Sequence, residues 1–85
     1  MDTNLSVQDL SITFVEPSAT QGRIIESRLK ELQARKILYF PNGADALESM
    51  QEFPPDLVIS AMYMPDMTGT DLVQAMRADP TLEAV

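Results

Sequence analysis

Cysteine and histidine are both absent from the 85 residues of the chain. Without cysteine the protein has no disulfide and no thiolate nucleophile, and without histidine it cannot carry a phosphohistidine. Metal sites built from cysteine or histidine side chains are excluded for the same reason. The lack of cysteine is consistent with a reducing compartment, and we expect a cytoplasmic protein.

Basic residues are scarce, because 6 Lys and Arg stand against 13 Asp and Glu and give a net charge of −7. This balance repels nucleic-acid backbones and anionic membrane surfaces, so we expect neither as a partner. No apolar run approaches the roughly 20 residues that span a bilayer, and the acidic N-terminus is unlike a signal peptide. Most basic residues surround one expected helix and are interleaved with Glu26 and Glu31, which indicates a solvated face with ion pairs. These basic residues are Arg23, Arg28, Lys30, Arg35 and Lys36.

Apolar residues make up 45% of the chain, as in an ordinary globular domain. At this length folding buries only roughly 60–65% of the unfolded surface, so the margin of stability is thin. Short apolar runs without strict alternation predict buried parallel strands at residues 12–15, 37–40 and 57–61. We expect an N-terminal extension at residues 1–10 and a single domain at residues 11–85.

Amphipathic patterns predict helices between and after these strands, at residues 22–34, 44–53 and 69–78. The predicted inward residues are Ile25, Leu29 and Leu32 in the first helix, Ala46, Leu47, Met50 and Phe53 in the second, and Leu72, Val73 and Met76 in the third. The order βαβαβα predicts an α/β fold with a parallel sheet and right-handed crossovers.

Local signals mark the ends of these helices. Pro54 stops the second helix, because proline cannot continue the hydrogen-bond ladder. Thr68 and Asp71 have the spacing of a capping box at the start of the third helix. Between them Gly69 is expected to supply a backbone conformation that a Cβ would oppose. Residues 81–85 look like the approach to a further strand.

The functional crevice of an open α/β sheet lies at the carboxyl ends of its strands. At those ends the sequence reads FVEPSATQGRII, YFPNGADAL and PPDLVISAMYMPDMTGTDL. Together these segments resemble the receiver domain of two-component response regulators, of the chemotaxis-regulator type, over nearly all of residues 11–85. The resemblance implies a flavodoxin-like fold with strand order 2-1-3, incomplete because the family's fourth and fifth strands would lie beyond residue 85. We expect the exposed third strand to be covered by dimerisation or by exchange of a strand or another element, or else the chain to be part of a longer protein.

The resemblance also implies where the family's functional positions fall. A working receiver has two adjacent acids after its first strand, at Glu16 and Pro17 here, and a phosphoacceptor aspartate after its third, at Ala61. Its Mg²⁺ ion also binds a backbone carbonyl, which falls on Tyr63, and its Ser or Thr and Lys would lie beyond residue 85. One carboxylate and one carbonyl are too few ligands for Mg²⁺. We therefore expect no bound metal, no other cofactor and no catalytic residue, with Mg²⁺ only in intact family members.

Other residues in the loop after the third strand offer further interpretations. Met62, Met64 and Met67 form a soft surface that, with Asp66, suits a protein partner. Partial burial against the neighbouring helix is the alternative for the methionines. Asp66 is also a candidate substitute phosphoacceptor, although the resemblance implies that its position points away from the crevice. Asp56, before the third strand, is expected to be a turn or cap residue.

The resulting hypothesis is a receiver-like signalling module that binds protein partners, is not an enzyme and is not phosphorylated at Ala61. We expect it to pair with itself as a homodimer or a domain-swapped dimer. One alternative is an ordinary phosphoaccepting receiver in a silenced or shortened form, since Ala61 fits either natural degeneracy or a deliberate change; Pro17 favours natural degeneracy. A second alternative is a Mg²⁺-dependent acidic site, unrelated to phosphorelay, built from Glu16 and Asp66.

Overall fold

The computed structural model describes residues 6–85, and its strands and helices alternate as the sequence predicted. The elements are the 3-10 helix η1 (Val7–Asp9), β1 (Ser11–Val15), α1 (Ala19–Glu31), β2 (Lys36–Phe40), α2 (Gly43–Glu52), β3 (Leu57–Ser60) and α3 (Gly69–Ala78). Each predicted strand is confirmed to within one residue at either end. Half of the predicted extension 1–10 lies outside the described residues, and its boundary stays a prediction.

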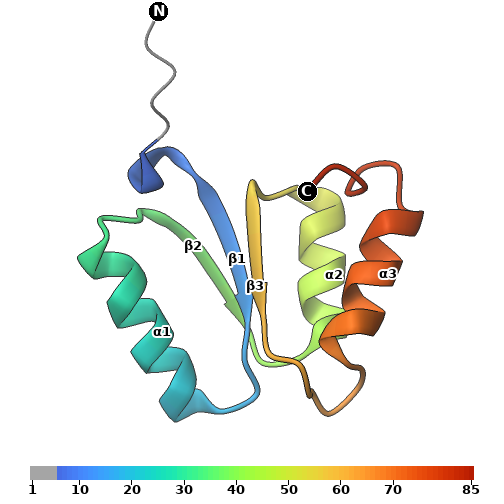
Figure 1. Ribbon diagram of the computed structural model, residues 1–85, viewed down its shortest axis with the longest axis horizontal. Helices are drawn as coiled ribbons and strands as arrows, with labels where there is room; N and C mark the ends of the chain where they lie inside the picture. The colour runs from blue at the N-terminus through green and yellow to red at the C-terminus, as the bar shows by residue number, and fades with distance from the viewer. Residues whose placement is uncertain (1–5) are drawn as a thin grey trace, which may run out of the picture.

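Parallel hydrogen bonding joins the strands in the order β2-β1-β3. Val15 pairs with Phe40 of β2 and with Ser60 of β3, so the strands end at the same level. Figure 1 shows α1 on one side of the sheet and α2 and α3 on the other. Right-handed crossovers generate this doubly covered parallel sheet. The predicted α/β class and the strand order 2-1-3 are confirmed.

The sheet separates two hydrophobic clusters, and the central strand β1 contributes to both. One cluster lies between the sheet and α1 and contains Ile12, Phe14, Leu29 and Ala34. The other lies under α2 and α3 and contains Val15, Ala46, Met50, Leu72, Met76 and Leu82. Alternate residues of a strand face opposite sides, which explains how one short strand can be apolar throughout. Among residues 6–85, no helix has the length and apolar content needed to cross a bilayer.

The outer face of α1 carries the ion pairs that its sequence predicted. Lys30 Nζ lies 3.5 Å from Glu26 Oε2, and Arg28 Nη1 lies 3.9 Å from Glu31 Oε1. Pairs on an exposed helix surface contribute little to stability, at most about 1 kcal/mol each. They show instead that this basic stretch is a solvated helix face.

Three residues predicted to face inward are exposed instead. Leu32 and Phe53 are 62% and 63% exposed because each lies one residue beyond the end of its helix. The first helix begins earlier than predicted, at Ala19, where the Ser18 side chain accepts a hydrogen bond from the amide of Gln21. Val73 is 44% exposed for a different reason, since it lies beside the outer edge of β3, with which no strand of residues 6–85 pairs.

Helix α3 has the predicted bounds, and its predicted capping box is present. The Thr68 side chain accepts from the Asp71 amide at 3.0 Å, and the Asp71 carboxylate accepts from the Thr68 amide at 3.1 Å. Residues 81–85 were expected to approach a strand, but 81–84 form a turn. Leu82 is fully buried in the cluster under α2 and α3, and Arg77 donates to the Glu83 carbonyl at 2.8 Å. These contacts fold the segment back against α3, and the expected approach to a further strand stays a prediction.

Candidate functional site

The tips of the strands meet at one edge of the sheet. The amide of Ala61, directly after β3, donates to the carbonyl of Val15 at 2.9 Å. The amide of Glu16, directly after β1, donates to the carbonyl of Phe40 at 3.0 Å. Backbone hydrogen bonds therefore hold the residues after β1 and β3 beside each other, in the crevice where open α/β sheets place their sites.

Glu16 uses part of its carboxylate to support the local fold. Its Oε2 accepts a hydrogen bond from the amide of Ser18 at 2.9 Å, and Ser18 is the N-cap residue of α1. A negative charge is favourable at this end of a helix because the helix dipole is positive there. Pro17 lies between them and offers no side-chain oxygen. Only one carboxylate therefore remains at the tip of β1.

Ala61 presents a methyl group at the tip of β3 and is half-buried. Its carbonyl accepts from the Ser60 hydroxyl at 2.8 Å. A Cβ on Gly69 would come within 2.8 Å of the same carbonyl oxygen. Gly69 has no positive φ, so it is required for space and not, as expected, for an unusual backbone conformation. A methyl group can neither attack a phosphoryl group nor bind a cation.

The donors at these tips do not match the requirements of Mg²⁺. This ion binds about six oxygens in near-octahedral geometry, with one or two carboxylates and several waters. The positions implied by the resemblance supply the Glu16 carboxylate, already bonded to Ser18, and the carbonyl of the highly exposed Tyr63. Within residues 6–85, no three acidic side chains gather closely enough to share a metal ion. The residues present do not fit the ion.

Asp66 caps helix α2, which the sequence did not reveal. Its Oδ2 accepts from the amide of Ala44 at 2.8 Å and its Oδ1 from the amide of Gly43 at 3.1 Å. These hydrogen bonds, from Ala44 first and then Gly43, hold the pKa of Asp66 below its ordinary value of 3.8. Both carboxylate oxygens are thus engaged, and the partners lie 22 and 23 residues earlier in the chain. No local sequence signal marks such a distant cap.

The methionines divide between surface and core. Met62 is 53% exposed, and its neighbour Tyr63 is 80% exposed. Met64 and Met67 are partly buried against the cluster under α2 and α3. Met67 also lies over Gly43, where a Cβ would collide with the methionine sulfur. The alternative of partial burial is confirmed for Met64 and Met67, while the partner surface with Met62 and Asp66 stays a prediction.

Tyr39 is a further contributor that sequence reasoning missed. Its hydroxyl donates to the Glu16 carbonyl at 2.7 Å, and its ring stacks on Phe14 with centroids 4.8 Å apart. A Cβ on Gly22 would lie only 3.0 Å from this ring, so glycine gives the tyrosine its space. Tyr39 therefore fixes the backbone of the β1–α1 loop. The Asp56 carboxylate accepts from the Ser11 amide at 2.8 Å, so it ties the start of β3 to the start of β1 and does not stabilise a local turn.

Asp66→Asn tests the cap on α2. The ionised carboxylate stabilises the folded state because its folded-state pKa lies below the unfolded value of about 3.8. This stabilisation is fully present above that value and is lost as the pH falls through the folded-state pKa. We expect the variant to melt at a lower Tm at pH 7, with the difference from the unmodified chain shrinking below pH 3.8. Glu48→Gln, on the exposed surface of the same helix, is the control; a difference independent of pH would contradict the assignment.

Comparisons with known proteins agree with this architecture. The model of the response regulator receiver domain family matches residues 12–85. The chain is 32% identical over 74 residues to chemotaxis protein CheY of Pseudomonas aeruginosa, covering 87% of this chain and 60% of the relative. It is 32% identical over 71 residues to chemotaxis protein CheY1 of Helicobacter pylori, covering 82% and 57%. The chain thus spans less than two thirds of the length of these relatives.

Two solved structures resemble the fold closely. A signal receiver domain of a signal transduction histidine kinase from Syntrophus aciditrophicus matches with a TM-score of 0.83 and 30% identity, over 89% of this chain and 57% of that one. The N-terminal domain of a response regulator receiver protein from Methanoculleus marisnigri matches with a TM-score of 0.82. Its identity is 24%, over 89% of this chain and 61% of that one, which is a likeness of fold alone.

Proposed function

The chain belongs to the response regulator receiver domain family, and from that premise we propose that it serves two-component signal transduction by binding protein partners, without accepting a phosphoryl group at position 61. The observation that supports this most directly is the methyl group of Ala61. It stands at the tip of β3, hydrogen-bonded through its amide to the tip of β1. Phosphoryl transfer needs an oxygen nucleophile and a cation to neutralise charge, and these tips supply neither in the usual way.

The same features define the rest of the proposal. The proposed module is not an enzyme and lies in the cytoplasm. It holds no resident Mg²⁺, because Pro17 stands where the resemblance places a second acid. Its partners are other signalling proteins and a second copy of itself, paired edge to edge or by exchange of an element. Exposed Met62 and Tyr63 offer a contact surface close to the strand tips. The acidic site built from Glu16 and Asp66 gains no support, since both carboxylates already accept backbone hydrogen bonds.

A phosphodonor experiment tests this function. The chain is incubated with acetyl phosphate and Mg²⁺, and its intact mass is measured. We expect no addition of a phosphoryl group, because the residue at the tip of β3 has no carboxylate. Ala61→Asp serves as the comparison, since it restores the carboxylate at that position alone. Phosphorylation of the unmodified chain, mapped by peptide mass spectrometry to any Asp or Glu, would overturn the proposal.

A further inference from the structure

Asn42 and Gly43 form the only Asn–Gly pair in the chain. In such a pair the backbone nitrogen of glycine can attack the side-chain carbonyl carbon of asparagine, because glycine has no Cβ to hinder the approach. The new C–N bond closes a succinimide ring. The side-chain nitrogen leaves as ammonia, which takes up the proton that the glycine nitrogen gives up. Water then opens the ring and leaves aspartate or isoaspartate at position 42, which completes a deamidation.

In the folded chain the two reacting groups are held by different carboxylates. The Asn42 side chain accepts from the amide of Asp45 at 2.8 Å and donates to its carboxylate at 3.0 Å. The amide of Gly43 donates to Asp66 Oδ1 at 3.1 Å. To attack, this amide must lose its proton and turn toward the asparagine side chain. A neighbouring carboxylate opposes that loss by repulsion between like charges, so Asp66 suppresses the nucleophile.

Met67 shields the same nitrogen from solvent. Gly43 is buried, and a Cβ built on it would collide with the side chain of Met67. This cover hinders the water or base that would have to remove the amide proton. Asp66 and Met67 both belong to the β3–α3 loop, whereas Asn42 and Gly43 begin α2. Protection of the nitrogen therefore depends on contact between two segments that are distant in the sequence.

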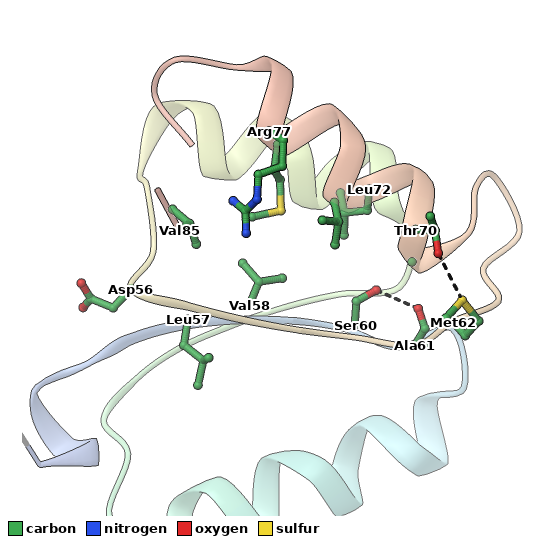
Figure 2. A pocket seen from close by; sticks show the side chains of 13 residues that line it. Asp56, Leu57, Val58, Ser60, Ala61, Met62, Thr70, Leu72, Arg77 and Val85 are labelled. Carbon is green, nitrogen blue, oxygen red and sulfur yellow. Dashed lines mark hydrogen bonds between the residues drawn. The ribbon is translucent and has the colours of Figure 1, made fainter. Parts of the chain in front are cut away.

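The β3–α3 loop has internal hydrogen bonds that do not involve α2. At its base the amide of Gly69 donates to the carbonyl of Met62 at 2.7 Å. Figure 2 shows Met62 beside Thr70 of α3, whose hydroxyl lies 3.8 Å from the methionine sulfur. These contacts can persist when the loop separates from α2. Asp66 and Met67 would then leave the reactive pair together.

We propose that Asn42–Gly43 is a deamidation site that the folded chain keeps closed through Asp66 and Met67, and that opens when the β3–α3 loop leaves α2. The inference is independent of the proposed function, because it needs neither a partner nor the residue at position 61. Isoaspartate adds a methylene group to the main chain directly before Gly43. The Gly43 amide can then no longer meet Asp66 in the same geometry, so the modification is a lasting record of loop opening.

Deamidation rates of Asp66→Ala and the unmodified chain test this inference. Both are incubated at mildly alkaline pH, well below their Tm, and peptide mass spectrometry follows the replacement of NH₂ by OH at Asn42. We expect Asp66→Ala to react about fivefold faster, the factor that corresponds to loss of a helix-capping side chain. Met67→Ala, which uncovers Gly43 but keeps the carboxylate, should also react faster. Circular dichroism checks that both variants remain folded.

Asp79→Ala is the matched control for a general loss of stability. Its carboxylate also accepts hydrogen bonds, from the Thr81 amide at 2.9 Å and from Gln51, near the opposite end of α2, at 3.1 Å. This variant should deamidate at nearly the rate of the unmodified chain. Equal acceleration in Asp79→Ala and Asp66→Ala would overturn the inference. An unmodified chain that deamidates as fast when folded as when unfolded in urea would overturn it too.

Discussion

Replacing Pro17 and Ala61 together by aspartate should create a Mg²⁺ site at the strand tips. The tips are joined by the hydrogen bond from the Ala61 amide to the Val15 carbonyl, so the new carboxylates would lie near Glu16. Three neighbouring carboxylates repel one another, and the double variant should therefore be less stable than the unmodified chain without metal. Mg²⁺ neutralises them, and at ten times its Kd it should restore about 1.4 kcal/mol. In a domain of this size, that corresponds to a rise in Tm of about 5–10 °C.

Thermal melts with and without Mg²⁺ measure this gain. The unmodified chain should show no Mg²⁺-dependent rise in Tm, and Ala61→Asp alone should show a smaller one than the double variant. The matched control replaces the same two residues by asparagine, which has nearly the same shape but no charge. If Mg²⁺ did not raise the Tm of the double aspartate variant, the strand tips would be too far apart to share an ion. The assignment of Glu16, Pro17 and Ala61 to one site would then be wrong.

Leu72→Ala should remove a large part of the stability of the whole domain. Leu72 is fully buried in the cluster that α2 and α3 form on the sheet. Truncating a buried leucine costs about 3–5 kcal/mol, because it loses burial and leaves a cavity. A domain of this length has a total stability of only about 4–13 kcal/mol. The variant should therefore unfold at a much lower urea concentration.

Urea unfolding followed by circular dichroism gives the free-energy difference from the shift of the midpoint at constant slope. Gln74→Ala, an exposed change on the same helix, should alter stability by less than about 0.5 kcal/mol. Both variants are compared at one low protein concentration, so that self-association does not contribute. A loss below about 1 kcal/mol for Leu72→Ala would contradict the close packing of α3 on the sheet.

Most of the fold could be predicted because burial and capping leave local traces in the sequence. The strands are short apolar runs, and α3 has the predicted bounds because Thr68 and Asp71 form the capping box at its start. The errors arose where a periodic pattern ran past a helix end, as at Leu32 and Phe53. The exposure of Val73 could not be predicted from periodicity, since it depends on which element lies opposite.

The candidate site was only partly predictable. The residues after each strand could be identified from the alternation of strands and helices, and the family resemblance assigned Glu16, Pro17 and Ala61 their roles. The hydrogen bonds that occupy Asp66 and fix the Glu16 carbonyl join residues 22 or more positions apart. Such contacts follow from the packed structure and have no sequence pattern of their own. Their detection required the arrangement of the loops in space.

Two sets of contacts connect the β3–α3 loop to helix α2, so a movement of the loop affects the helix. Asp66 holds the loop by hydrogen bonds, and Met67 holds it by packing over Gly43. A protein that binds the neighbouring Met62 and Tyr63 and displaces this loop would displace the first turn of α2 as well. If position 61 accepts no phosphoryl group, as we propose, movement of this loop would transmit the binding of a partner near the strand tips to helix α2.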